Sequence, residues 1–360
     1  MLHIIGIVGV PAKYGGFETL VDYLLDSKKI KSLEVVVYCE KEVCEAQKGH
    51  YKGAKLASIK WRANGWQSVF YDLSALWRAS KQGGNILILG TSATFIIPVL
   101  RCFFPSCTFI VNMAGLEWSR SKWGAFASWF LKFNEMMAAK FAHFFITDNK
   151  GLTDYIRKQY NKDSIMIPYG GDQFLEAASD QDVFNEFDLP DEFDFAMARS
   201  QIDNNMEVIL DAYAKSGQEL VFVSNWKSST YGKALLEKYV DVPNLNLIGP
   251  IYDVGKIKAL YQKTRIYIHG HSAGGTNPVL VESMWARLPV LAFDVTFNRH
   301  TTHNKAFYFK DSQELAKLSQ TLKNDSLTRC AQSLYQIAND CYKWEHIQSC
   351  YESVIFNEAR

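Results

Sequence analysis

Residues 267–284 read YIHGHSAGGTNPVLVESM, and they predict a strand, a loop of small residues and a helix. The apolar start is typical of a buried strand. Pro278 fits the first position of a helix, where its missing N–H is not needed. Small residues such as Gly274 and Gly275 let backbone amides approach a ligand, and a helix N-terminus favours a phosphate. The stretch therefore predicts an anion site at the carboxyl end of a strand.

Glu282 lies one helical turn beyond Pro278, on the face that turns back toward the loop. A carboxylate in that position could accept hydrogen bonds from sugar hydroxyls. The alternative is an ordinary glutamate on the solvent-facing side of a helix. The position of Glu282 alone leaves both readings open.

The alternation of strand, loop and helix extends along the chain. Apolar strand runs are expected at 3–8, 34–39, 85–89, 108–112, 144–147, 164–167, 195–198, 220–224, 245–248, 265–269, 290–293 and 306–309. Helical patterns are expected at 17–26, 68–81, 94–103, 122–141, 150–160, 204–216, 230–240, 254–263, 278–286, 312–322 and, as a tail, about 327–358. Strands separated by helices imply βαβ units and parallel sheets.

A turn-forming cluster, IPYGGD at 167–172, interrupts this alternation, and an acidic irregular stretch follows it. We therefore expect an α/β protein of two Rossmann-like domains, with ligand bound at the carboxyl ends of the strands in the cleft between the domains. We expect an N-terminal domain at 1–168, a linker at 169–193 and a C-terminal domain at 194–340. A helical tail at 341–360 could pack back on the first domain.

A second glycine-containing loop occupies residues 6–18, GIVGVPAKYGGFE. It follows the first strand and ends in Gly15 and Gly16, where a helix begins, so its amides could hold a phosphate. Neither the Gly-x-Gly-x-x-Gly fingerprint of dinucleotide binding nor a Walker loop occurs there. An ordinary glycine-rich turn is the alternative.

Composition narrows the class of protein. The 360 residues are 48% hydrophobic and 21% charged, which is typical of a globular chain. The net charge of +1 gives no general attraction to nucleic acid. The seven cysteines include no Cys-x-x-Cys pair, and Met1 leads into a strand without a basic signal segment. We expect a reduced, cytoplasmic protein.

The charge is unevenly distributed. Residues 1–180 carry 21 Lys/Arg and 16 Asp/Glu, whereas residues 181–360 carry 18 and 22. Residues 118–145 are rich in aromatics and contain Arg120, Lys122, Lys132 and Lys140. Most of these aromatics should be core, but an exposed subset beside basic residues could rest on a membrane interface.

Other groups of reactive residues give little support for a metal site or a hydrolase. His269, His271, His300 and His303 have no carboxylate or cysteine at ligand spacing, so we expect no metal. An Asp-x-Asp at 180–182 is not preceded by an apolar strand. Hydrolase signatures such as Gly-x-Ser-x-Gly do not occur.

Four segments carry a resemblance to a known family. They are VGVPAKYGGFE at 8–18, GLEW with KW at 115–118 and 122–123, HGHS through NP at 269–278, and FNR with TT at 297–302. Together with Glu282 and LPV at 288–290, they resemble retaining GT-B glycosyltransferases of family 4, and most closely bacterial capsular and O-antigen rhamnosyltransferases. That resemblance implies two facing Rossmann-like domains and a nucleotide-sugar held mainly by the second.

The resemblance also implies roles for residues at matching positions. Arg199 would neutralise the diphosphate leaving group, and Glu282 would bind the ribose hydroxyls. Glu117 is the nearest candidate for a catalytic carboxylate on the acceptor side, and a structural, hydrogen-bonding glutamate is the alternative. Ile251 and Tyr252 would lie beside the nucleobase. The remaining donor-binding candidates are Gly15, Gly16, Asn204, Gly274, Gly275, Thr276, Asn277, Pro278 and Val279.

Three positions depart from the family pattern. Gly274 stands where family 4 usually has a glutamate, which removes one sugar-hydroxyl contact. Asn204 stands where a lysine usually follows the phosphate arginine, so Arg199 would carry most of the phosphate charge. Ala114 stands where relatives often have an acidic residue, which leaves the acceptor-side contacts open.

The predicted function is a metal-independent, retaining glycosyltransferase without a cofactor other than its nucleotide-sugar co-substrate. It would transfer L-rhamnose from dTDP-rhamnose to a lipid-linked glycan during assembly of a surface polysaccharide. The alternatives are a UDP-sugar-dependent hexosyl or galactofuranosyl transferase, a catalytically silent GT-B partner subunit and, more weakly, a GT-B epimerase.

Overall fold

The computed structural model describes residues 1–12, 15–113, 115–120 and 123–358. Lys13, Tyr14, Ala114 and Lys122, which belong to the segments discussed above, lie outside the described residues. The chain divides into two compact units. The first unit comprises Met1–Tyr169 with Trp344–Arg360, and the second comprises Gly170–Lys343.

The first unit is built on an eight-stranded sheet in the order β3-β4-β2-β1-β5-β6-β7-β8. Every neighbouring pair is parallel except β3 with β4. The strands are β1 (Leu2–Ile5), β2 (Val35–Glu40), β3 (His50–Tyr51), β4 (Ala54–Ile59), β5 (Gly84–Leu89), β6 (Cys107–Met113), β7 (Phe144–Thr147) and β8 (Ile165–Met166). Their apolar runs are buried on both faces, as a parallel sheet requires.

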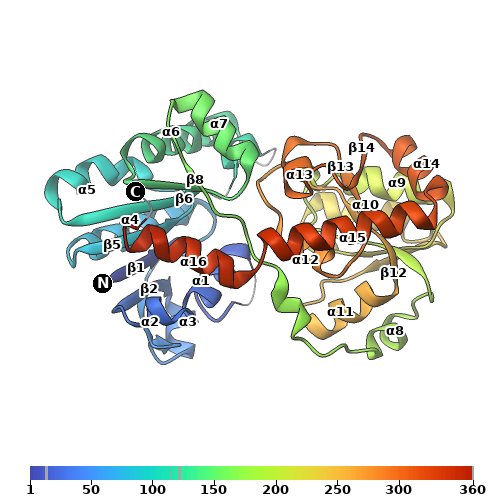
Figure 1. The fold of residues 1–360 in the computed structure, drawn as a ribbon, viewed down its shortest axis with the longest axis horizontal. Helices are drawn as coiled ribbons and strands as arrows, with labels where there is room; N and C mark the ends of the chain where they lie inside the picture. The colour runs from blue at the N-terminus through green and yellow to red at the C-terminus, as the bar shows by residue number, and fades with distance from the viewer. Residues whose placement is uncertain (13–14, 114, 121–122, 359–360) are drawn as a thin grey trace. The chain divides into compact units, whose positions relative to one another are not determined.

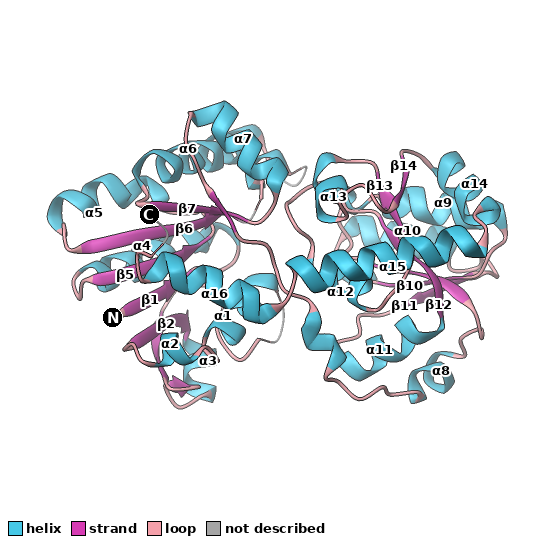
Figure 2. Cartoon of the chain, in the orientation of Figure 1, coloured by secondary structure: helices cyan, strands magenta, loops and turns pink. Residues whose placement is uncertain are grey.

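Helices cover both faces of this sheet (Figures 1 and 2). They are α1 (Gly16–Leu24), α2 (Lys28–Lys31), α3 (Lys41–Ala46), α4 (Ser68–Ser80), α5 (Ile97–Phe103), α6 (Ala125–Phe141), α7 (Lys150–Tyr160) and α16 (Trp344–Ile355), with 3-10 turns η1 (Gly65–Gln67), η2 (Thr94–Ile96) and η3 (Glu117–Ser119). Helix α16 comes from the end of the chain and lies beside α1 (Figure 1), where Trp344 stacks on Tyr23 with ring centroids 4.5 Å apart. The last helix therefore completes the core of the first unit.

The second unit contains a six-stranded parallel sheet in the order β11-β10-β9-β12-β13-β14. Its strands are β9 (Phe193–Met197), β10 (Leu220–Val223), β11 (Leu245–Ile248), β12 (Thr264–His269), β13 (Val290–Phe293) and β14 (Phe307–Phe309). Its helices are α8 (Asp182–Phe187), α9 (Met206–Ser216), α10 (Thr230–Tyr239), α11 (Val254–Lys263), α12 (Pro278–Trp285), α13 (Thr296–Thr301), α14 (Ser312–Thr321) and α15 (Asn324–Cys341), with η4 (Asp172–Leu175), η5 (Ile202–Asn204) and η6 (Trp226–Ser228). The order of strands and helices is that of a doubly wound α/β unit.

The expected α/β class and the two parallel sheets are confirmed, while two details of the chain's division differ. The single tail helix expected over 327–358 is wrong, because α15 ends at Cys341 and α16 begins at Trp344. Tyr342 interrupts the helix, and its carbonyl accepts from Gly171 N at 3.0 Å and Trp285 Nε1 at 3.3 Å.

The segment expected to be a linker, 169–193, belongs to the second unit from residue 170 onward. Phe174 and Val183 are buried in the core of that unit, so the segment is packed rather than a loose connection. Within the described residues, no helix has both the length and the hydropathy needed to cross a bilayer.

Candidate functional site

Two loops of the second unit meet at one edge of its sheet. Arg199 follows β9, and residues 270–277 follow β12, the strand paired in parallel with β9. Because parallel strands end at the same edge, both loops lie at the carboxyl ends of the strands. This is the edge where ligands bind in open α/β sheets.

Hydrogen bonds join these two loops directly. Ser272 donates from its backbone N and from its Oγ to the carbonyl of Asp203, each at 2.8 Å. Asn205 Nδ2 donates to the carbonyl of Gly270 at 2.8 Å. In each of these bonds the acceptor is a backbone carbonyl.

Asn204 supports the loop that carries Arg199. Its side chain is buried, and Nδ2 donates to the Arg199 carbonyl at 2.7 Å. The side chain of Arg199 is exposed at this edge of the sheet. The structure thus gives Asn204 a role in shaping the loop, and its contact with a donor stays a prediction.

Helix α12 begins at Pro278, as the sequence predicts, and Asn277 caps it. Asn277 Oδ1 accepts from Val279 N at 3.0 Å, which is the usual role of an asparagine N-cap. Thr276 is buried beside the cap, while Gly275 and Val279 are partly exposed. Small residues and a helix N-terminus therefore coincide at this edge.

Glu282 lies on α12 and accepts a hydrogen bond from Gln173 Nε2 at 2.8 Å. Burial raises the pKa of its carboxyl to about 7, and the bond from Gln173 opposes that rise. Gln173 belongs to η4, directly after the glycine pair at 170–171. Gln173 was not predicted as a site residue, although it directly follows the turn-forming cluster at 167–172.

Buried polar atoms surround Glu282. The side chains of Tyr261 and Tyr267 are buried, and the negative charge of Glu282 adds to the effect of burial in raising both phenol pKa values. Their hydroxyls have no hydrogen-bond partner among the described residues. His269, at the end of β12, is also fully buried, and its ring stacks on His271 with centroids 4.5 Å apart. Burial holds the His269 pKa well below its usual value, so this ring is neutral.

Ile251 and Tyr252 follow β11, another strand of the same parallel sheet. Ile251 packs partly against the core, and Tyr252 is exposed. Their loop therefore ends at the same edge of the sheet as Arg199, and their contact with a nucleobase stays a prediction.

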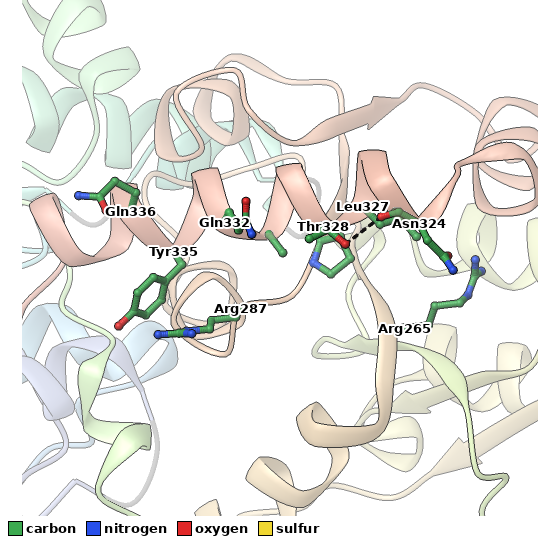
Figure 3. A pocket seen from close by; sticks show the side chains of 10 residues that line it. Arg265, Arg287, Asn324, Leu327, Thr328, Gln332, Tyr335 and Gln336 are labelled. Carbon is green, nitrogen blue, oxygen red and sulfur yellow. Dashed lines mark hydrogen bonds between the residues drawn. The ribbon is translucent and has the colours of Figure 1, made fainter.

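A separate cavity of about 640 Å³ lies at the opposite edge of the second unit (Figure 3). Arg265 and Pro289, at the amino-terminal ends of β12 and β13, line it together with α15. Arg265 pairs with the buried Asp194, with Nη2 at 2.7 Å from Oδ2, and Arg287 stacks on Tyr335. This cavity is thus distinct from the loops around Arg199.

The corresponding loop of the first unit is held by acidic side chains. Glu18 Oε1 accepts from Val8 N at 3.0 Å, and Asp22 Oδ2 accepts from Ala12 N at 3.3 Å. Gly15 caps α1 and Gly16 begins it. The predicted phosphate loop therefore already contains a carboxylate in the first turn of its helix.

Glu117 lies in η3 and forms an ion pair with Arg120, with Oε1 and Nη2 2.8 Å apart. This contact favours the reading of Glu117 as a structural residue. Its catalytic role stays a prediction, because Ala114, on which the acceptor-side comparison depends, lies outside the described residues. Among the described residues, no three His, Cys, Asp or Glu side chains form a group suited to a metal ion.

Sequence comparison gives limited information about the family. Residues 1–172 match the model of a domain of unknown function (DUF1972). No curated protein matches the sequence. The match covers most of the first unit and leaves the loops around Arg199 and Glu282 outside it.

Solved structures resemble the whole chain. Sucrose-phosphate synthase (tll1590) from Thermosynechococcus elongatus aligns with a TM-score of 0.81 and 15% identity, over 99% of this chain and 98% of that one. The chain has the GT-B fold. A glycosyltransferase from Rickettsia africae aligns at 0.73 with 12% identity over 98% and 97%, and Anabaena Alr3699/HepE aligns at 0.75 with 13% identity over 98% of each chain. At these identities the likeness shows the fold, and the predicted GT-B architecture is confirmed.

Proposed function

We propose that the protein is a glycosyltransferase that takes its sugar from a nucleotide-sugar bound by the second unit. The proposal rests on one observation. Ser272, in the loop before α12, donates two hydrogen bonds to the carbonyl of Asp203, in the loop that carries Arg199. These bonds place a guanidinium-bearing loop and the N-terminus of α12 at one edge of a parallel sheet. Positive charge and a helix start together suit a diphosphate.

The proposed reaction proceeds with retention at the anomeric carbon and without a metal. The bond between C1 of the sugar and the diphosphate oxygen breaks, and a new C1–O bond forms to an acceptor hydroxyl on the same face. The proton of that hydroxyl passes to the departing phosphate. The main demand on the protein is to stabilise negative charge that develops on the leaving diphosphate, which Arg199 and the amides before α12 would meet.

Glu282 would orient the donor. Its carboxylate can accept from two hydroxyls, such as those of a ribose, in place of the bond from Gln173. Gly274 leaves open space where a side chain would stand, since no other heavy atom lies within 4 Å of a Cβ built there. Without the usual glutamate at this position, the sugar pocket would suit a deoxy-sugar.

We propose L-rhamnose from dTDP-rhamnose as the donor and a lipid-linked glycan of a surface polysaccharide as the acceptor. Support comes from the four sequence segments that resemble rhamnosyltransferases and from Gly274. A second candidate, a UDP-hexose donor, is favoured by Anabaena HepE, which was solved with UDP and glucose.

Binding of nucleotides followed by transfer assays tests the proposal. Calorimetry with dTDP, UDP and GDP should show micromolar binding of dTDP and weaker binding of the other two. Tighter binding of UDP would favour the hexosyl alternative. Turnover should then require dTDP-rhamnose and a lipid-linked acceptor. An altered sugar nucleotide formed without acceptor would indicate an epimerase.

Absence of turnover with every donor would contradict the proposed enzyme. If the activity of a partner transferase then depended on this chain, the protein would be a silent subunit. Arg199→Ala separates these outcomes, since it should lower kcat about 10²–10³-fold in an enzyme and leave the support of a partner unchanged.

A further inference from the structure

The first unit exposes large aromatic side chains to an unusual degree. Among the described residues, the exposed Phe and Trp side chains all belong to this unit, on or beside α4, α5 and α6. They are Trp66, Phe70, Trp77, Phe103, Phe126 and Trp129. The exposed large apolar side chains of the second unit are Leu175, Ile202, Val240, Tyr252 and Val254.

Helix α6 carries its aromatics on the face opposite its buried side. Phe126 is 79% exposed and Trp129 is 61% exposed, and Trp129 stacks on Phe133 with centroids 5.9 Å apart. The spacing of three and then four residues places the three rings on one face. The buried residues of α6, Asn134, Glu135, Ala138 and Ala139, lie on the other side. The outward face is therefore the apolar one.

Helix α5 extends this apolar surface, because it packs against α6. Arg101 Nη1 donates to the Phe141 carbonyl at 2.7 Å, and Phe95 meets Phe130 edge to face. The outer side of α5 exposes Val99 and Phe103, the latter at 71%. We name the outward side chains of α5 and α6, namely the exposed Val99, Phe103, Phe126 and Trp129 and the half-buried Phe133, the aromatic face.

The charges on the two helices of the aromatic face are mostly positive. Arg101, Lys132 and Lys140 belong to α5 and α6, against one acidic residue, Glu135, and residues 60–143 as a whole contain nine Lys/Arg and three Asp/Glu. Asp72 and Glu135 are buried, and Glu117 is paired with Arg120. Lys140 is exposed and lies two helical turns beyond Phe133, on the same side of α6.

Tyrosine hydroxyls hydrogen-bond to the one acidic group that α6 contains. Glu135 Oε1 accepts from Tyr155 and from Tyr160, each at 2.7 Å. Its carboxylate is thereby directed into the unit and away from the aromatic face. Exposed carboxylates that would repel an anionic surface are consequently absent from α4, α5 and α6.

We propose that the aromatic face is a docking surface for an anionic lipid bilayer. Aromatic rings and lysines side by side suit the boundary between headgroups and acyl chains, where rings enter the apolar region and ammonium groups meet phosphates. A second copy of this chain would carry the same positive charge on the same face, so charge favours the lipid surface over self-association. The inference extends the proposed function, since it would bring the enzyme to a lipid-linked acceptor.

Vesicle flotation of the full chain tests this surface without any need for turnover. The wild-type protein should float with vesicles of phosphatidylcholine and phosphatidylglycerol. It should bind at least about tenfold more weakly to phosphatidylcholine alone, and raising the salt from 0.05 to 0.5 M should reduce binding to the anionic vesicles. Failure of catalysis with intact flotation would overturn the proposed function and leave the docking surface standing.

Two variants locate the contact. Phe126→Ser with Trp129→Ser should lower the affinity for anionic vesicles about tenfold or more, because each ring contributes apolar area to the membrane contact. Lys140→Glu should weaken binding by a few-fold and reduce its salt dependence. Neither change removes core packing, so the thermal unfolding midpoint should stay within about 2 °C of the wild type.

Matched controls come from the second unit. Val240→Ser removes a side chain that is 57% exposed, and Lys215→Glu reverses an exposed charge. Both should bind vesicles as the wild type does. The proposal is overturned if the wild type does not bind anionic vesicles, or if the Phe126→Ser, Trp129→Ser variant binds them as well as the controls do. It is also overturned if sedimentation shows that this variant loses only self-association.

Discussion

Each unit places a glycine-containing loop between a strand and a helix, yet the two loops are held by opposite means. In the first unit the carboxylates of Glu18 and Asp22 accept from backbone amides of the loop. In the second, the loop before α12 is tied by the carbonyl of Asp203 and the amide of Asn205. In the first loop a diphosphate would compete with these carboxylates for the backbone amides, whereas in the second the bonds to Asp203 and Gly270 are accepted by backbone carbonyls.

This difference shows that a glycine-rich loop is insufficient evidence of a phosphate site. Residues 6–18 and 270–278 both satisfy the same pattern of small residues before a helix. The side chains that return to the loop decide whether its amides are committed to the protein or available to a ligand. The predictions below test that contrast, beginning with the largest effect.

Arg199→Ala should remove the main positive charge available to the leaving group. The expected loss is about 10²–10³-fold in kcat, equivalent to about 3–4 kcal/mol of transition-state stabilisation. Steady-state kinetics with the preferred donor measures it. Arg287→Ala, which removes an exposed arginine near the opposite edge of the same sheet, should leave kcat within about twofold. Equal losses in the two variants would contradict the role of Arg199.

Gly15→Ala and Gly274→Ala compare the surroundings of the two loops. Both glycines have a positive φ, 112° and 117°, so alanine strains the backbone at either position. At Gly15 the new Cβ would also lie 2.2 Å from Glu18 Oε2, whereas at Gly274 the space is open. We expect a loss of local stability of about 2–3 kcal/mol at Gly15 and about 1–2 kcal/mol at Gly274.

Hydrogen exchange of the amides of α1 and α12 measures these two losses separately. Exchange in α1 is sensitive to the substitution at Gly15, and exchange in α12 to the substitution at Gly274. Equal loss of protection in the two helices would show that the Glu18 carboxylate moves away from the new Cβ without lowering the stability of α1. The contrast between the loops would then be smaller than the geometry indicates.

Glu282→Gln tests the donor site through its pH dependence. The pKa of about 7 means that the wild-type carboxyl becomes a stronger acceptor for hydroxyls as the pH rises through 7. Donor affinity, measured by calorimetry, should increase about five- to tenfold between pH 6 and 8 in the wild type and stay constant in the variant. A parallel pH profile in both proteins would exclude Glu282 as the titrating group.

The same carboxyl has a consequence for stability. Its pKa in the folded state is raised from 4.5, so the folded protein binds the proton more tightly than the unfolded chain does. The stability that this proton provides is complete below pH 4.5 and is lost as the pH rises through 7. Glu282→Gln should therefore unfold at a higher temperature than the wild type at pH 8, with the difference vanishing below pH 4.5.

Glu18→Gln should have the smallest effect, and it tests the first loop. The amide keeps an oxygen for Val8 N but removes the negative charge at the N-terminus of α1, which costs about 0.5–1 kcal/mol. If the loop approaches a diphosphate, as the resemblance implies for Gly15 and Gly16, donor affinity should rise two- to fivefold in the variant. Unchanged affinity would assign the loop to structure alone.

Regular elements were largely predictable from the sequence. Strands 144–147, 245–248 and 290–293 and helices 150–160 and 254–263 have the expected bounds. Sequence reasoning missed β4, because AKLASI has a weaker apolar run than its neighbours and gains its place by pairing with β2. It also joined α15 and α16, since both are amphipathic and the break at Tyr342 depends on contacts with Gly171 and Trp285.

The candidate site was predictable only in part. The sequence identified Pro278 as the first residue of a helix, because its missing N–H fits that position, whereas Asn277 was predicted as a donor-binding residue and proves to be the N-cap. Gln173 was missed, because it approaches Glu282 from a position 109 residues earlier in the chain. Contacts across such separations leave no local pattern.

The amino-acid sequence by itself determined that apolar β-branched runs alternate with helices, and hence that two parallel sheets form, since burial and helix capping act over a few residues. Tertiary structure alone decided that Asp203 and Ser272 join two loops, that the half-buried Glu282 lies near Tyr261 and Tyr267, and that α6 turns its rings outward. These features depend on which surfaces pack together, and packing sets the solvation, the charge and the pKa of each group.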